Sequence, residues 1–150
     1  MITNKAVLKD RLLAKGIKPT YQRTAILGFL LDNRTHPTIK SLHNSLVKTI
    51  PTLSKTTLYS TLELFAAKGL VAPLTIDRSE VRYDGLASSH HHFLCERCGR
   101  IIDVDVSCAN SRRGEIGGHR IKEVHGYFKG ICKDCLKQTY KTNKRRIFHG

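Results

Sequence analysis

Two pairs of cysteines constrain the fold of this 150-residue chain more than any other feature. Cys95 and Cys98 form one C-x-x-C pair, and Cys132 and Cys135 form the other, with 33 residues between the pairs. Each pair offers two thiolates on a tight turn, and together they match the four-sulfur tetrahedron that Zn²⁺ accepts. The sequence therefore predicts a structural zinc site. A redox-active C-x-x-C is the alternative, but neither pair heads a helix in a βαβ pattern.

Residues 1 to about 70 have the apolar spacing of short helices. We expect helices over residues 5–15, from Thr20 as N-cap, from 36–38 to a stop at 51, and from Ser54 as N-cap to about 68. Pro37 suits the first turn of the third helix, and Gly16 and Gly69 follow the ends of the first and fourth. The side chains expected to face inward are Val7, Leu8, Leu12, Leu13, Ile26, Leu27, Leu30, Leu31, Ile39, Leu42, Leu46, Val47, Leu58, Leu62, Phe65 and Ala66.

Two β-like segments, 70–76 and 80–84, follow these helices across a polar turn. Short helices followed by a β-hairpin have the order of a winged helix-turn-helix, in which the last helix enters the major groove of DNA. The net charge of +14 favours a polyanionic partner. Residues 1–84 are therefore predicted to be a winged-helix DNA-binding domain. Its fourth helix offers a polar face with Lys55, Thr56, Tyr59 and Ser60.

The composition changes from about residue 85, because cysteine and histidine concentrate between residues 90 and 135. Further β-like segments are expected at 91–94, 100–106 and 127–131. Residues 85–150 are thus predicted to be a small second domain that carries the metal ligands and ends in a basic tail. The predicted fold class is α+β, with a winged helix-turn-helix followed by a small α/β domain that contains a four-cysteine zinc site.

A histidine run within the second domain suggests another kind of metal site. On a strand, His90 and His92 would share one face while His91 points to the other. Asp84 and Asp103 lie at the ends of neighbouring β-like segments, where their carboxylates could complete the site. Mixed nitrogen and oxygen ligands suit Fe²⁺, Mn²⁺, Co²⁺ or Zn²⁺. The alternative is a set of solvated surface histidines.

The chain resembles the ferric uptake regulator family of dimeric, metal-dependent bacterial repressors. The resemblance runs from about Leu12 to Cys135 and includes His90-x-His92-x-x-Cys95-x-x-Cys98-Gly99 and Gly130-x-Cys132-x-x-Cys135. It also rests on residues 22–27, His36-Pro37-Thr38, 54–71 and Arg82-Tyr83-Asp84.

This resemblance implies a role for each matching residue. Cys95, Cys98, Cys132 and Cys135 match the structural zinc ligands of the family, and His36, Asp84, His90, His92 and Asp103 match its regulatory metal ligands. Tyr59 matches a base-contacting tyrosine, and Arg23 matches an arginine that reaches the minor groove. The implied partners are operator DNA and a second copy of the chain, in the cytoplasm, with Zn²⁺ as structural cofactor and Fe²⁺ or Mn²⁺ as regulatory cofactor.

Asp103 and Asp84 make the chain more similar to the peroxide-sensing branch of this family than to its iron-sensing branch. In that branch peroxide is reduced at bound Fe²⁺, and the oxidant attacks a histidine ligand, His36 or His90 by resemblance. Mn²⁺ would support DNA binding without this chemistry. An iron-responsive or other metal-responsive repressor is the alternative, and a zinc-ribbon nucleic-acid-binding protein without sensing is less favoured. We do not expect an enzyme, because no activated nucleophile or general base is evident beyond the metal ligands.

Some positions depart from the family pattern. The resemblance implies an amphipathic dimerisation helix between residues 105 and 121, but here the segment is short, polar and interrupted by three glycines. Cys108 is expected to be a buried inert thiol, and His43 a surface residue. A third metal site at His91 is not expected. Its candidate partners, which do not match the family register, are Glu115, His119 and His125.

Overall fold

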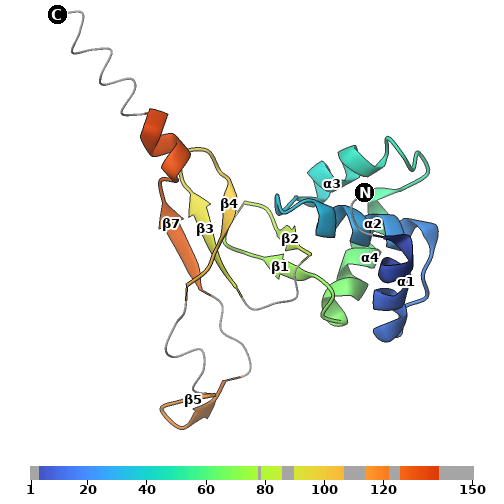
Figure 1. Ribbon diagram of the computed structural model, residues 1–150, viewed down its shortest axis with the longest axis horizontal. Helices are drawn as coiled ribbons and strands as arrows, with labels where there is room; N and C mark the ends of the chain where they lie inside the picture. The colour runs from blue at the N-terminus through green and yellow to red at the C-terminus, as the bar shows by residue number, and fades with distance from the viewer. Residues whose placement is uncertain (1–3, 78, 86–89, 107–113, 122–125, 139–150) are drawn as a thin grey trace, which may run out of the picture. The chain divides into compact units, whose positions relative to one another are not determined.

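The computed structural model describes residues 4–77, 79–85, 90–106, 114–121 and 126–138. The chain separates into two compact units, residues 1–88 and residues 89–150. Helices dominate the first unit, and short strands dominate the second (Figure 1). We describe each unit by itself.

Four helices form the first unit: α1 (Lys5–Ala14), α2 (Tyr21–Asp32), α3 (Ile39–Leu46) and α4 (Lys55–Ala67). The side-chain oxygens of Thr20 and Ser54 accept hydrogen bonds from backbone N–H groups in the first turns of α2 and α4, which confirms both predicted N-caps. Gly16 and Gly69 follow α1 and α4 with φ values of +69° and +65°. Each therefore ends its helix in the left-handed conformation that glycine adopts without strain.

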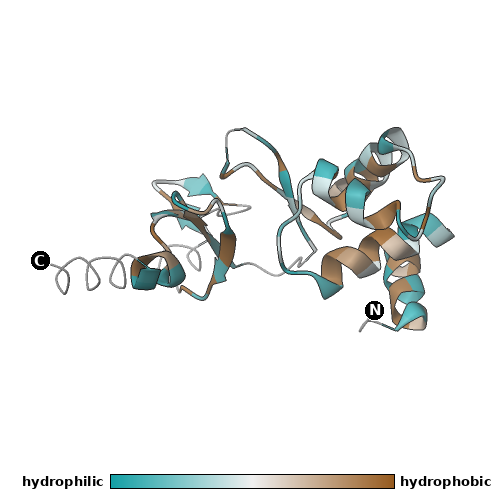
Figure 2. Cartoon of the chain, turned by 90° about the horizontal axis from the view of Figure 1, so that it is seen from above, coloured by the Kyte–Doolittle hydropathy of each residue, from teal (hydrophilic) through white to brown (hydrophobic). Residues whose placement is uncertain are grey.

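A hydrocarbon core lies between these helices. Phe65, Leu12, Ile26 and Leu62 are all inaccessible to solvent, and leucines from every helix join them. Figure 2 shows this hydrophobic character running through the helices near the N-terminus. Burial of so many large apolar side chains is the main source of stability for this unit.

A small β-ribbon completes the first unit. Strands β1 (Ala72–Leu74) and β2 (Arg82–Asp84) pair antiparallel, with Pro73 opposite Tyr83. The N–H of Tyr83 also donates to the carbonyl of Pro37 over 3.1 Å, which ties β2 to the residues before α3. The order of helices followed by a β-ribbon is that of a winged helix-turn-helix, and it supports the predicted α+β fold class.

The helices differ from the sequence-based expectation at three points. Pro37 does not lie in the first turn of α3, because Thr38 is the N-cap and the Pro37 carbonyl accepts the strand hydrogen bond instead. The helix ends at Leu46, and hydrogen-bonded turns continue the chain to residue 50. On α1, Val7 and Leu13 are exposed, because each lies about 100° around the helix from a buried leucine.

The second unit is built on a three-stranded sheet with the order β4-β3-β7. The central strand β3 (His91–Cys95) pairs antiparallel with β4 (Ile101–Val104) and parallel with β7 (Tyr127–Gly130). Residues 133–138 are helical and follow β7. This pairing places the end of β3 beside the end of β7, so the two cysteine pairs meet there.

The segment expected from the resemblance to hold a dimerisation helix is different in its described part. Residues 114–121 form a hairpin of β5 (Glu115–Ile116) and β6 (His119–Arg120), and residues 107–113 lie outside the described part. Gly117 and Gly118 both have positive φ, at +57° and +82°. Two such residues form the tight turn that two-residue hairpins require, which is incompatible with a continuous helix.

Among the described residues, no helix combines the length and apolar character needed to cross a membrane.

Candidate metal centres

Four cysteines converge at one end of the three-stranded sheet. Cys95 ends β3, Cys98 lies on the turn before β4, and Cys132 and Cys135 flank the start of the helical residues 133–138. Their sulfur atoms all lie within 4.8 Å of one another. Two cross-pair distances, Cys95 to Cys135 and Cys98 to Cys132, are both 3.9 Å between the sulfur atoms.

These distances fit a zinc tetrahedron. Metal–sulfur bonds of about 2.3 Å give sulfur–sulfur edges of about 3.8 Å, whereas a disulfide would require about 2.05 Å. None of these four cysteines is in a disulfide. An all-sulfur, four-coordinate cage with no open position is the donor set of a structural zinc site, so the predicted Zn²⁺ cofactor fits these residues.

The protein environment acts differently on the individual thiols. The backbone N–H of Cys132 donates to the Cys95 sulfur, which lowers the pKa of Cys95 to about 6. Hydrogen bonding from Arg100 lowers the pKa of Cys98, whereas burial raises the pKa of Cys135 to about 12. Because zinc is bound by thiolates, its binding releases the protons of the thiols, and zinc affinity will fall as the pH falls.

A second cluster with mixed ligands lies on the same unit. His90, His92 and Asp103 offer ligand atoms that lie within 4.8 Å of one another. Nε2 of His90 is 3.4 Å from Oδ1 of Asp103, and Nε2 of His92 is 3.8 Å from the same oxygen. Because β4 pairs with β3 so that Asp103 lies opposite His92, the register itself creates this cluster. Metal–ligand bonds of about 2.1 Å place neighbouring ligand atoms about 3.0 to 3.4 Å apart, so the three side chains fit one ion.

Two further predicted ligands lie together on the first unit. Nε2 of His36 is 3.9 Å from Oδ1 of Asp84, and both side chains are buried. The bond between Tyr83 and Pro37 brings the ends of their two segments together. His36 has a φ of +48°, the only positive value for a described residue other than glycine. That strained conformation costs about 1–3 kcal/mol, and such residues cluster at functional sites.

His91 lies apart from these ligands. Its ring is buried and meets the edge of Phe128 at a centroid distance of 6.0 Å. Gly126 packs directly against it, since a Cβ on Gly126 would lie 2.5 Å from Nδ1 of His91. Of its suggested partners, Glu115 and His119 lie on the exposed β5–β6 hairpin, and residue 125 is outside the described part of the chain.

The residues predicted to contact DNA are accessible on the first unit. Tyr59 is 52% exposed, and the other predicted residues of α4 are exposed as well, while the opposite side of the helix is buried. Arg23 is half-buried, and one of its guanidinium nitrogens donates to the Lys18 carbonyl over 3.0 Å. The predicted residues on α4 are Lys55, Thr56, Tyr59 and Ser60.

The sequence-based prediction was wrong for His43 and overlooked Arg100. His43, expected at the surface, is half-buried and its Nε2 lies 2.9 Å from the Leu53 carbonyl, which connects α3 to the turn before α4. Arg100 was not singled out, although it contacts the cysteine cage. An arginine directly after C-x-x-C-G was the available signal. Cys108 lies outside the described residues, so its predicted burial stays a prediction.

Comparison with known proteins places these features in one family. The model of the ferric uptake regulator family matches residues 14–128. The peroxide operon regulator of Bacillus subtilis is 32% identical over 137 residues, which cover 86% of this chain and 91% of that protein. The peroxide-responsive repressor PerR of Staphylococcus aureus is 34% identical over 128 residues, with coverages of 80% and 83%.

Solved structures agree with the fold. The ferric uptake regulator of Pseudomonas aeruginosa, solved with manganese, superposes with a TM-score of 0.70 at 25% identity and covers 85% of this chain and 98% of that one. The family match extends over both units described above. The chain therefore belongs to the ferric uptake regulator family.

Proposed function

We propose that this protein is a metal-dependent transcriptional repressor that senses peroxide. The observation that carries the proposal is the convergence of His90, His92 and Asp103, a nitrogen and oxygen donor set separate from the all-sulfur cage. A cage with four thiolates serves structure, whereas mixed ligands suit an exchangeable Fe²⁺ or Mn²⁺. Two relatives that cover most of this chain are named as peroxide regulators, which supports peroxide as the signal.

The proposed division of labour follows the sequence. Residues 1–84 bind operator DNA, and residues 85–150 bind metal and form a homodimer. His36 and Asp84 contribute ligands from the first region to the same regulatory ion as the three ligands of the second. Because the ion would then favour one arrangement of the two regions, its binding shifts the population toward the DNA-binding form.

On DNA, α4 is proposed to be the recognition helix. Its exposed side carries a cation, two hydroxyls and the phenol of Tyr59, which suit contacts to phosphates and base edges. Arg23 has five N–H donors, and the bond to Lys18 leaves others to reach the DNA at the minor groove. A two-fold symmetric operator would match a homodimer. The proposed location is the cytoplasm.

The proposed response to peroxide ends in the loss of a ligand. Fe²⁺ held by these ligands would supply one-electron chemistry toward peroxide, which Mn²⁺ would not. His36 or His90 is the side chain that takes up oxygen. An oxidised imidazole is a poorer ligand, so the regulatory site weakens and the repressor leaves DNA.

The test uses a fluorescent duplex that is selected from a random pool with the Mn²⁺-loaded full-length protein. Binding is followed by anisotropy with Fe²⁺-loaded protein, prepared without oxygen, before and after stoichiometric peroxide. We expect binding to be lost in the iron form only, and not to be restored by fresh Mn²⁺. Mass spectrometry should find one added oxygen atom on the peptide that contains His36 or His90.

Variants separate the regulatory site from general histidine effects. His92→Ala and Asp103→Asn should abolish the DNA binding that added metal supports. His119→Ala, on the exposed hairpin, should bind DNA as the parent protein does. Binding that needs metal but survives peroxide would replace peroxide sensing with iron or other metal sensing. Binding that is indifferent to added Fe²⁺ and Mn²⁺ would leave only a zinc-ribbon DNA-binding protein.

A further inference from the structure

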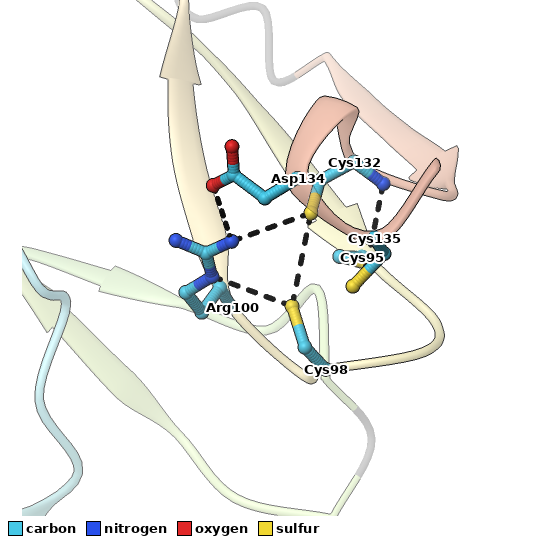
Figure 3. A network of polar contacts seen from close by, with 6 residues as sticks. All are labelled: Cys95, Cys98, Arg100, Cys132, Asp134 and Cys135. Atoms are coloured by element: carbon cyan, nitrogen blue, oxygen red, sulfur yellow. Dashed lines mark hydrogen bonds and ion pairs between the residues drawn. The ribbon is translucent and has the colours of Figure 1, made fainter. Parts of the chain in front are cut away.

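Arg100 connects the two cysteine pairs outside the sulfur cage. It lies two residues after Cys98, and its guanidinium reaches a cysteine of each pair (Figure 3). Nε donates to the Cys98 sulfur over 3.4 Å, and Nη2 donates to the Cys132 sulfur over 3.4 Å. Nη2 also donates to Oδ2 of Asp134 over 2.7 Å. One side chain thus links residues that are 32 and 34 positions away in the sequence.

These contacts include the exposed cysteine of the cage. Cys98 is exposed, whereas the other three cysteines of the cage are buried. Cys95 receives its hydrogen bond from the backbone N–H of Cys132, inside the cage. Arg97 also crosses to the second pair, but it donates to the backbone carbonyl of Cys135 and not to a sulfur. The guanidinium of Arg100 therefore contacts the sulfur atoms of two cysteines, Cys98 from the first pair and Cys132 from the second.

The charge of a zinc cage explains why a guanidinium is suited to this place. Four thiolates around one Zn²⁺ leave a net charge of about −2. Arginine remains protonated and presents its donors in a rigid planar fork. Charge-assisted hydrogen bonds to the sulfurs withdraw electron density from them, and residues around a metal site orient its ligands in this way. The short contact with Asp134 fixes the fork in its orientation.

We propose that Arg100, oriented by Asp134, is a positioning residue that keeps Cys98 and Cys132 bound to zinc and protects these two thiolates from peroxide. Without it, the two thiolates would give two electrons to one hydrogen peroxide molecule. A Cys98–Cys132 disulfide would form, the peroxide would take two protons and leave as two water molecules, and Zn²⁺ would be released. The protection confines the response to the histidine and aspartate ligands, and this last consequence alone rests on the proposed function.

The first test measures zinc release from the full-length zinc-loaded protein into an excess of a chromogenic chelator. We expect Arg100→Gln to release zinc about tenfold faster than the parent, in line with losses around other metal sites. Arg100→Lys should fall between the two, because it keeps the charge without the fork, and Asp134→Asn should show a smaller increase. Arg120→Gln, an exposed arginine on β6, is the matched control and should release zinc at the parent rate.

A spectroscopic test separates this role from simple support of the fold. In Co²⁺-substituted protein, the sulfur-to-metal charge-transfer band reports electron density on the thiolates. Removal of the guanidinium in Arg100→Gln should move the band to lower energy, and Arg100→Lys should restore part of the shift. An unmoved band together with parent-like zinc release in Arg100→Gln, or an equal effect in Arg120→Gln, would overturn the proposal. If Arg100→Gln does not fold, Arg100→Lys and Asp134→Asn decide by the same two measurements.

The protective part has its own readout, independent of DNA binding. Zinc-loaded protein without iron or manganese is titrated with hydrogen peroxide, and the disulfide is located by mass spectrometry. Arg100→Gln should form the Cys98–Cys132 bond at lower peroxide concentration than the parent and Arg120→Gln do. Equal sensitivity of Arg100→Gln and the parent would refute protection while leaving the regulatory site untouched.

Discussion

The two units of this protein are stabilised by different means. The first buries hydrocarbon side chains from four helices, including Phe65, which is fully inaccessible. In the second, one buried cluster consists of Cys95, Cys132 and Cys135, with Phe93 and Ile102 packed against it. A helical unit with a large apolar core can fold by itself, whereas a unit with its thiols at the centre depends on metal. The contrast identifies where zinc contributes to folding.

Removal of zinc is the strongest test of this contrast. Structural zinc contributes about 10–16 kcal/mol in zinc-finger peptides. EDTA treatment under reducing conditions, or Cys132→Ser, should remove hydrogen-exchange protection from β3, β4 and β7 and leave α2 and α4 protected. Added zinc should restore hydrogen-exchange protection in the EDTA-treated parent protein. If α4 loses protection to the same extent as β3, the two units do not fold independently.

Two adjacent leucines on α1 test the apolar core of the first unit. Leu12 is 0% exposed and Leu13 is 59% exposed. Leu12→Ala should lower the free energy of unfolding by about 2–5 kcal/mol through the cavity that it leaves. Leu13→Ala should change it by less than about 0.5 kcal/mol. Urea denaturation followed by helical circular dichroism measures both, and zinc content should stay the same. Equal effects of the two substitutions would mean that α1 is packed differently.

Gly85 tests how closely the chain approaches α2 after β2. A Cβ at this position would lie 2.8 Å from the Leu30 carbonyl oxygen, which is backbone and cannot rotate away. We expect Gly85→Ala to destabilise the first unit by about 1–3 kcal/mol. Gly130→Ala is the control in the second unit, since its Cβ would meet Phe93 at an ordinary 3.4 Å. A thermal melt in which Gly85→Ala is as stable as the parent would contradict the close approach.

The smallest expected effect concerns the N-cap of α4. The Ser54 hydroxyl oxygen accepts from the N–H of Thr57 over 3.0 Å. Ser54→Ala should cost about 1 kcal/mol, and Ser54→Asp should preserve the cap. Urea midpoints of the two variants check this, while zinc release should be unaffected in both. A stable Ser54→Ala protein would show that packing of α4, and not its cap, fixes where the helix begins.

Local chemistry made several elements predictable. Thr20 and Ser54 are N-caps because their short oxygen side chains satisfy free N–H groups, and Gly16 and Gly69 end helices because they tolerate positive φ. The spacing of apolar residues was less informative about burial, because packing between elements decides which side of a helix is covered. Val7 is apolar like its neighbours but lies on an exposed side of α1.

The candidate site was predicted unevenly for the same reason. Two C-x-x-C pairs are short-range motifs, so the cage could be recognised from spacing alone. Alternation along a strand placed His90 and His92 together, and their rings are 4.5 Å apart. Arg100 was missed because its partners Cys132 and Asp134 are more than 30 positions away and reach it only when the sheet has formed.

The sequence by itself determined what depends on neighbours along the chain: the caps, the turns, the thiol pairs and the family to which the motifs point. Only the tertiary structure decided the strand register that sets Asp103 opposite His92, the hydrogen bond that brings His36 to Asp84, and the reach of Arg100 across the cage. The physical reason is that motifs and caps act over a few bonds, whereas register and side-chain convergence depend on the free energy of packing the whole unit.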